Sequence, residues 1–240
     1  MQLYFIRHGQ SENNLTFFLT RSDDYRCEDP LLTAGGHEQA ERLAEFLASR
    51  RAEQAANPRD DLNVTGFGLT HLYCSLMERA VATGAAVAKR LQLPLLPWYE
   101  LHETGGVFLT DPATGERMGR PGRTARYLRH TYPELVIDEN LYPDGWWNRS
   151  FEERPERRPR AERLLAGLLE RHGGTDDRVA FFSHGHFYNH ILGAILGLPE
   201  EPPAWFIINN TAITRIDYID GHWDLVYTNR TDHLPPHLIT

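Results

Sequence analysis

Cysteine, lysine and long apolar runs are scarce in this sequence of 240 residues, and each scarcity excludes a class of protein. Two cysteines, Cys27 and Cys74, are too few for a disulfide-stabilised scaffold, and they form neither a zinc-binding pattern nor a redox pair. No apolar run approaches the ~20 residues that a membrane-spanning helix needs. Residues 1–6 lack the basic start and long apolar core of a signal peptide, so we expect a soluble, cytoplasmic protein.

Positive charge is also scarce, and almost all of it is arginine. Lys89 is the one lysine among 25 basic residues, against 33 acidic residues, which gives a formal net charge of −8. Such a charge opposes non-specific binding of polyanions, and the sequence has no basic stripe with interleaved aromatic residues. We therefore expect neither a nucleic acid nor a membrane as a partner. Arginine suits bidentate binding of phosphate or carboxylate, although a GC-rich coding sequence would produce the same bias.

What the sequence does contain is a repeated strand–loop–helix pattern, in a length and a composition that suit one globular domain. Short apolar runs that end in polar loops predict buried strands at 2–6, 68–74 and 178–183. Helical spacing of apolar residues predicts helices from 33 to about 56, from 77 to 91 and from 185 to about 196. Strands and helices that alternate in this way imply an α/β fold, a three-layer sandwich around a mainly parallel sheet.

Three further segments complete the predicted domain. Ser75 and Glu78 have the Ser-x-x-Glu spacing of a capping box, which predicts the start of the helix that follows. The turn at 220–221 predicts a hairpin that finishes one edge of the sheet. Residues 104–160 have weak periodicity and contain Trp146 and Trp147, and we interpret them as a cap inserted into a single domain that spans 1–240.

Three of the predicted strand ends carry polar clusters, and ligands bind beyond the carboxyl ends of the strands in open parallel sheets. These clusters are Arg7-His8-Gly9, Ser75 with Arg79, and His184-Gly185-His186. The fold brings all three to one rim, where their arginines and histidines would form a pocket for a dianion. Glu103 follows another short apolar run, at 93–101, and could reach the same rim.

These residue types support transfer of a phosphoryl group to histidine. A neutral His8 is a good nucleophile toward phosphorus, and nearby arginine charge lowers its pKa and keeps it unprotonated. Arg7 and Arg79 could hold the phosphoryl oxygens, while His184 donates a hydrogen bond to them. Glu103, if its pKa is raised, could protonate the leaving alkoxide. No metal or other cofactor is required, because the guanidinium groups balance the phosphate charge.

Several segments resemble, in the same order along the chain, the motifs of the histidine phosphatase superfamily, in the branch of phosphoglycerate mutases and their phosphatase relatives. The matching segments are 5–14, 32–40, 75–80, 101–103 and 183–186. Together with the strand pattern they span most of the chain, except for 104–160. The resemblance implies a phosphoglycerate mutase-like fold with an inserted cap.

The resemblance also implies a role for each matching residue. His8 would be the phosphorylated nucleophile and Glu103 the proton donor. The phosphate pocket would be completed by Arg7, Arg79 and His184. Asn14 matches a position that contacts phosphate in the family, and Gly9 and Gly185 would allow close approach of the substrate.

Two departures from the mutases favour a phosphatase that acts on a small-molecule phosphate monoester. Glu103 is followed by Thr-Gly-Gly-Val-Phe at 104–108 instead of a Tyr-Gly segment. The adjacent pair Arg157 and Arg158 lies far downstream, in a charged run typical of a solvated helix. Without those elements a phosphoglycerate would be poorly retained for rephosphorylation. A phosphoglycerate-type mutase is the alternative.

Two other classes stay open. His184, His186 and His190 have a spacing that a metallohydrolase could use, but no matching cluster elsewhere completes such a site, and we predict no metal. A noncatalytic scaffold that binds a phosphorylated ligand or a protein is the third class, and the complete catalytic set argues against it. Exposed edges of such sheets often pair, which leaves a homodimer open.

Overall fold

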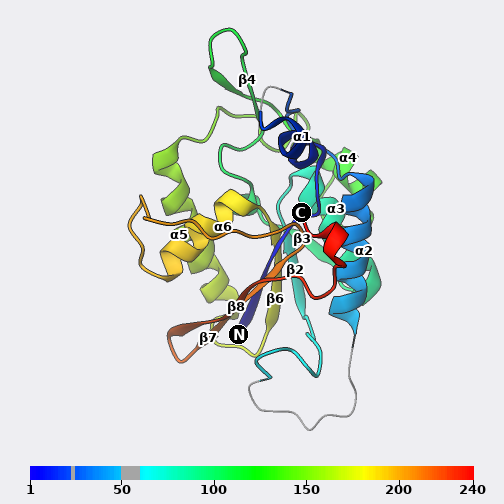
Figure 1. Cartoon of the computed structure of the whole chain (residues 1–240), viewed down its shortest axis with the longest axis vertical. Coiled ribbons are helices and arrows are strands. Elements are labelled where there is room, and N and C mark those ends of the chain that lie inside the picture. The colour runs from blue at the N-terminus through cyan, green and yellow to red at the C-terminus, as the bar shows by residue number, and fades with distance from the viewer. Residues whose placement is uncertain (23–24, 50–59) are drawn as a thin grey trace.

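The computed structural model describes residues 1–22, 25–49 and 60–240. Within these ranges a six-stranded sheet has the order β3-β2-β6-β1-β7-β8 (Figure 1). The strands are β1 (Gln2–Arg7), β2 (His71–Cys74), β3 (Leu95–Pro97), β6 (Arg178–Ser183), β7 (Ile213–Ile219) and β8 (His222–Arg230). Strands β3, β2, β6 and β1 run parallel to one another. Strand β7 pairs antiparallel with β1, and β8 pairs antiparallel with β7. The predicted mainly parallel sheet is confirmed.

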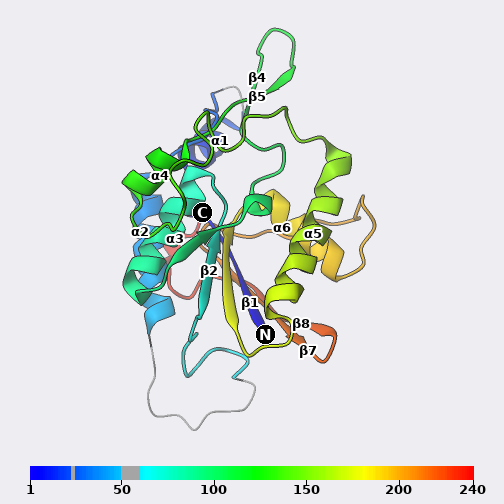
Figure 2. The same cartoon turned by 180° about the vertical axis from the view of Figure 1, so that it is seen from behind.

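Helices cover both faces of this sheet and make the three layers that the sequence predicts. The helices are α1 (Glu12–Thr20), α2 (Ala34–Ala48), α3 (Glu78–Leu91), α4 (Ala125–Thr131), α5 (Arg154–His172) and α6 (Gly185–Ile195), with short 3-10 turns η1 (Tyr99–Leu101) and η2 (Pro236–Leu238). In Figures 1 and 2, α2 and α3 lie on one face and α5 and α6 on the other. Residues 50–56, at the end of the helix predicted from 33, lie outside the described residues.

The central strand β1 is buried on both faces, which explains its uninterrupted apolar run. Tyr4 and Ile6 belong to the apolar cluster under α2 and α3. Leu3 and Phe5, which alternate with them, belong to the cluster under α5 and α6. The two-residue period of a strand therefore divides one short segment between two cores.

The predicted hairpin at the sheet edge is confirmed. Strands β7 and β8 pair antiparallel with Ile219 opposite His222. Asp220 and Gly221 both have positive φ, 50° and 85°, as the tight turn between such strands requires. None of the helices in the described ranges is long and apolar enough to cross a membrane.

The segment predicted as a cap rises from the carboxyl end of the sheet. It contains a small hairpin, β4 (Phe108–Thr110) with β5 (Arg117–Gly119), which stands at the top of Figures 1 and 2, and then α4. Trp146 and Trp147 are buried in the core beneath it. The segment ends earlier than expected, because residues 154–160 are the first turns of α5, a helix that packs on the sheet through Ala161 and Leu164.

Candidate active site

Three strands of the sheet end side by side, and each is followed directly by a polar residue. Register places Arg7 opposite Ser183 in the β1–β6 pair and Cys74 opposite Phe182 in the β2–β6 pair. The backbone N–H of His8 donates to the carbonyl of Ser183 at 2.9 Å, which extends the ladder by one residue. The three polar clusters predicted from the sequence therefore lie together at one end of the sheet.

The His8 ring is buried, and its hydrogen bonds fix which nitrogen carries the proton. Nδ1 lies 2.6 Å from the carbonyl oxygen of Gly9, which can only accept, so Nδ1 is the protonated nitrogen. Nε2 accepts a hydrogen bond from Nε of Arg79 at 3.2 Å. Burial, followed by the charges of Arg79 and Arg7, lowers the pKa of His8 well below its usual value. The ring is neutral, with a lone pair on Nε2.

Arg79 is held in this position by an ion pair that the sequence reasoning missed. Its Nη1 lies 3.6 Å from Asp29, and both side chains are almost fully buried. Asp29 also accepts a hydrogen bond from the backbone N–H of Glu78 at 3.1 Å, at the start of α3. Burial raises the pKa of Asp29 to about 6. The residue lies in an irregular loop after α1, where no periodic signal marks it.

Ser75 is not the N-cap of α3, which corrects the capping-box prediction, although its hydroxyl accepts a hydrogen bond from the backbone N–H of Met77 at 3.2 Å. Met77 is the N-cap of α3 and makes no side-chain capping bond. The Ser75 hydroxyl also lies 2.9 Å from Nε2 of His184. Glu78 reaches the cap, where it accepts hydrogen bonds from Arg123 and Tyr127. The contact of Ser75 with His184 therefore takes precedence over the local capping pattern.

His184 faces His8 across the end of the sheet, with ring centroids 5.1 Å apart. The His184 side chain is fully buried. Burial, followed by the charge of Arg79, lowers its pKa well below the usual value. Its Nδ1 has no hydrogen-bond partner among the described residues. A buried polar atom of this kind is costly unless a ligand satisfies it.

Arg7 also leaves a buried donor open to a ligand. Its Nη1 donates to the carbonyl of Ile208 at 2.7 Å, while Nε is buried and unpaired within the described ranges. Burial lowers the pKa of Arg7 to about 10, so the guanidinium stays charged at neutral pH. A side chain on Gly185 would meet Arg7 only at an ordinary contact distance of 3.5 Å. The role of Gly185 in close approach of the substrate stays a prediction.

Glu103 lies at the N-terminus of α6, where it binds backbone N–H groups. One carboxylate oxygen accepts from Phe187 at 2.9 Å and the other from His186 at 3.2 Å. Burial raises the pKa of Glu103, but the His186 side chain, the backbone N–H groups of Thr104 and His186, and the charge of Arg79 outweigh burial and lower the pKa overall. The sequence-based expectation is a raised pKa, whereas the structure gives the opposite direction, so Glu103 is ionised at neutral pH.

A buried ion pair that the sequence analysis did not predict holds the backbone around Glu103. Arg160 of α5 pairs with Glu152, with Nη2 and Oε2 2.9 Å apart and both side chains 3% exposed. Arg160 also donates to the carbonyl of His102 at 2.9 Å. The pair therefore fixes the residue next to Glu103. The first turns of α5 are rich in arginine, and the sequence pattern does not distinguish the buried Arg160 from its neighbours.

Gly9 follows His8, and its close packing against α2 requires a glycine. A side chain at Gly9 would meet the carbonyl oxygen of Gly36 at 2.6 Å. Its role in close approach of the substrate stays a prediction. Asn14 accepts hydrogen bonds from Ser11 at the start of α1 and from Asn210. Asn210 also donates to the His8 carbonyl at 2.9 Å, which ties the loop before β7 to the site.

The three histidines of the metal alternative do not converge within the described residues. His184 is buried against Ser75, whereas His186 is exposed and lies 4.0 Å from Glu103. The His190 ring stands edge-on to Trp205, with centroids 5.8 Å apart. Only the first of the three belongs to the buried centre, so their spacing does not produce a metal-binding group.

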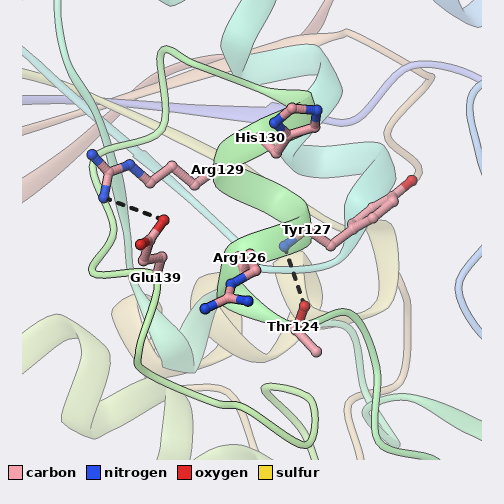
Figure 3. A pocket seen from close by; sticks show the side chains of 6 residues that line it. All are labelled: Thr124, Arg126, Tyr127, Arg129, His130 and Glu139. Atoms are coloured by element: carbon pink, nitrogen blue, oxygen red, sulfur yellow. Dashed lines mark hydrogen bonds and ion pairs between the residues drawn. The ribbon is translucent and has the colours of Figure 1, made fainter.

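A hollow lies on the surface of α4 and shares no residue with the His8 cluster (Figure 3). Its lining consists of Thr124, Arg126, Tyr127, Arg129, His130 and Glu139. Arg129 and Glu139 approach to 4.0 Å, and both side chains are about half exposed. Exposed pairs of this kind contribute little free energy. We place the candidate active site at His8, where buried donors are unpaired.

The chain is similar to known proteins over almost its whole length. The sequence profile of the histidine phosphatase superfamily (branch 1) matches residues 3–231. A probable phosphoglycerate mutase from Enterobacter sp. (strain 638) is 26% identical over 227 residues, which cover 93% of this chain and 87% of that protein. A similar protein from Proteus mirabilis (strain HI4320) is 26% identical over 230 residues, with the same coverage of both chains.

Solved structures of named phosphatases share the fold. A putative alpha-ribazole-5'-P phosphatase from Escherichia coli has a TM-score of 0.61 at 22% identity, over 96% of each chain. A phosphoserine phosphatase mutant from Entamoeba histolytica has a TM-score of 0.58 at 20% identity, over 98% of this chain and 99% of that one. Since the profile matches nearly the whole chain, this protein belongs to branch 1 of the histidine phosphatase superfamily.

Proposed function

We propose that this protein hydrolyses phosphate monoesters by transferring the phosphoryl group first to Nε2 of His8 and then to water. The observation that carries the proposal is the state of the His8 ring. Its proton is on Nδ1, bonded to Gly9, and its Nε2 lone pair faces the guanidinium of Arg79. A neutral imidazole beside fixed positive charge is both a nucleophile and a binding site for an anion.

The buried donors around His8 suit a phosphoryl group. Arg7 Nε and His184 Nδ1 are buried and unpaired within the described ranges, and Arg79 Nε can turn from His8 to a phosphoryl oxygen. Guanidinium groups offer charged hydrogen bonds that match phosphate geometry. Because these groups are held before the substrate arrives, they stabilise the charge that spreads over the phosphoryl oxygens during transfer.

Glu103 is the proposed proton carrier, and its ionised state sets a condition on the reaction. A monoester that binds as a monoanion brings a proton, since the second pKa of such a phosphate is about 6. The negative charge of the bound phosphate offsets Arg79 and raises the pKa of Glu103, so the carboxylate takes up that proton. It then protonates the leaving oxygen as the ester P–O bond breaks and the His8 N–P bond forms.

The second half of the reaction regenerates the site. Water attacks the phosphorus of phosphohistidine, its proton passes to the Glu103 carboxylate, and the N–P bond electrons return to Nε2 of His8. Inorganic phosphate leaves, and the carboxyl proton goes with it or to solvent. All charges and protons balance without a metal. The cap at residues 104–153 is proposed to select the ester.

A phosphoglycerate-type mutase is the second candidate, because the similar curated proteins carry the name probable phosphoglycerate mutase. Both reactions begin with the same phosphohistidine. A mutase returns the phosphoryl group to the substrate, whereas a phosphatase gives it to water. Incubation with 3-phosphoglycerate separates them, since a mutase forms an isomer and a phosphatase releases inorganic phosphate.

The experiment that tests the proposal is hydrolysis of an aryl phosphate in excess EDTA at mildly acidic pH. We expect turnover by the wild-type chain and a loss of turnover in His8→Ala, with the fold retained by circular dichroism. His130→Ala, which changes an exposed histidine on α4, serves as the matched control. Turnover in His8→Ala, or activity that requires a divalent ion, would contradict the mechanism.

A further inference from the structure

Two histidines and an aspartate converge at the opposite end of the sheet from His8. His71 begins β2, His172 ends α5, and Asp177 lies in the loop that leads into β6. Their ligand atoms all lie within 4.8 Å of one another. No step proposed for His8 uses these residues, and none of them belongs to the motifs of the superfamily resemblance.

The distances suit a small cation. Nδ1 of His172 lies 2.8 Å from one oxygen of Asp177, and Nδ1 of His71 lies 3.7 Å from the other. Ligand atoms at about 2.0–2.2 Å from a tetrahedral Zn²⁺ ion are separated by about 3.4 Å from one another. These two distances run to different oxygens of Asp177, and all the ligand atoms lie within 4.8 Å of one another. Side-chain movements of up to about 1 Å would bring them to the separations of a tetrahedral ion.

The surroundings already orient the buried ligand. Nε2 of His172 lies 3.1 Å from the hydroxyl of Tyr73, which is also buried. When Nδ1 binds a metal, the imidazole proton must lie on Nε2, where it can be donated to this hydroxyl oxygen. Metal-binding histidines commonly donate their second N–H in this way, which fixes the ring and its tautomer.

The loop that carries Asp177 is held at both ends. The backbone N–H of Gln2 donates to the Asp177 carbonyl at 2.8 Å, and Asp177 N–H donates to the Thr175 hydroxyl at 3.1 Å. That hydroxyl donates to the carbonyl of His172 at 3.0 Å. Two of the three ligands are therefore placed by backbone contacts before any ion binds, which reduces the entropy cost of binding.

One contact competes with the ion. The Thr70 hydroxyl lies 2.9 Å from Nδ1 of His71. The Thr70 hydroxyl also donates to the carbonyl of Arg178 at 3.2 Å. It therefore keeps one hydrogen bond when a metal ion replaces it at Nδ1 of His71. His71 is partly exposed, which gives the ion and a fourth, water ligand access from solvent.

We propose that His71, His172 and Asp177 bind a divalent transition-metal ion of the zinc type, with water as the fourth ligand. Two imidazoles and a carboxylate are the donors that such ions accept. The bound ion would tie the start of β2 to the end of α5 and to the loop before β6. Its effect is therefore on stability, at a distance from the phosphoryl-transfer site.

The test measures binding of Zn²⁺ and Co²⁺ to the metal-stripped full chain carrying His8→Ala, which removes the catalytic imidazole as a competing ligand. Calorimetry with Zn²⁺ gives stoichiometry and affinity, and visible absorption by Co²⁺ reports tetrahedral coordination. We expect one ion per chain and a higher melting temperature with Zn²⁺ present. His71→Ala and Asp177→Asn should each weaken binding by at least about tenfold, whereas His222→Ala, on an exposed position of β8, should not.

Neither variant changes the fully buried part of the cluster, so both should fold. Asp177→Asn retains an oxygen that can accept a hydrogen bond from His172. This variant therefore removes the charge of the ligand while keeping the shape of the side chain. Equal Zn²⁺ affinity in the parent, His71→Ala and Asp177→Asn would overturn the proposal, as would absence of binding in the parent. In either case the three residues form only a hydrogen-bonded cluster.

Discussion

Nε of Arg79 donates a hydrogen bond to Nε2 of His8 across 3.2 Å. The nitrogen proposed to attack phosphorus is therefore the one that a guanidinium contacts in this structure. This contact keeps a proton off Nε2, because a charged donor already faces its lone pair. Phosphate can replace His8 as the acceptor, which frees the lone pair at the moment the phosphorus arrives.

Arg79→Gln should lower kcat/KM for an aryl phosphate by about 10²–10³, since removing one preorganised donor typically costs that much. It should also raise the pKa of His8, because a cation that disfavours the imidazolium is removed. The acidic limb of the kcat/KM profile would then move to higher pH. Arg42→Gln, on an exposed part of α2, is the control. An acidic limb that does not move would contradict this account of His8.

Glu103→Gln should slow the hydrolysis of esters with poor leaving groups much more than that of esters with good ones. A glutamine cannot protonate an alkoxide, so hydrolysis of an alkyl phosphate should fall by about 10²–10⁴. An aryl phosphate with an acidic phenol needs little protonation in the first step and should show a smaller loss in a pre-steady-state burst. Glu100→Gln, three residues upstream, should leave both rates close to wild type. Equal losses for both esters would argue against Glu103 as the acid.

Acid should destabilise the fold through its buried histidines. His8, His102 and His184 have pKa values well below 6.5, first because of burial, whereas the unfolded chain takes up their protons near pH 6.5. The unfolded state then binds more protons, so the free energy of unfolding falls as pH drops below about 6.5. Each histidine contributes about 1 kcal/mol per pH unit to that slope.

His102→Asn isolates one of these contributions. Asparagine does not titrate, and its amide can replace Nδ1 as a donor to the Glu103 carbonyl. The slope of unfolding free energy against pH, from urea melts below pH 6.5, should decrease by about 1 kcal/mol per unit. Asp29, with a pKa raised to about 6, changes the slope in the opposite direction, but by the same amount in the wild type and in His102→Asn. Identical slopes would show that His102 is not held neutral.

Arg160→Met should destabilise the protein by about 3–5 kcal/mol, because it leaves the Glu152 carboxylate buried without its partner. The same change should lower kcat more than it raises KM, since the carbonyl of His102 loses its anchor next to Glu103. Arg42→Ala removes an exposed pair on α2 and should change stability by less than about 1 kcal/mol. A loss no larger than that of Arg42→Ala would contradict the buried pair's role.

The sequence predicted the sheet and the polar strand ends well because both depend on local patterns. A strand buried on both faces needs a run of apolar residues, and the interiors of β1 and β6 have one. The polar residue that follows each strand then marks the end of the sheet where ligands bind. The same reasoning missed Asp29, since a lone carboxylate in an irregular loop has no period. It also mistook Ser75 for a helix cap, because its partner His184 is distant in sequence.

The protonation state of Glu103 was beyond sequence reasoning for a related physical reason. Burial alone raises the pKa of a carboxyl group. The opposing influences include the His186 side chain, Arg79 and the backbone N–H of His186 at the start of α6, which depend on tertiary geometry. Gly9 is similar, because its need for glycine comes from Gly36 on another element.

The most direct test of the central claim is to trap the phosphoenzyme. The wild-type chain is mixed with an aryl phosphate, quenched in base within one turnover and measured by intact mass spectrometry and peptide mapping. We predict a mass increase of one phosphoryl group, stable in base and labile in acid, on the peptide that contains His8, and no increase in His8→Ala. Turnover without such an intermediate, or a phosphoryl group on another residue, would contradict the account.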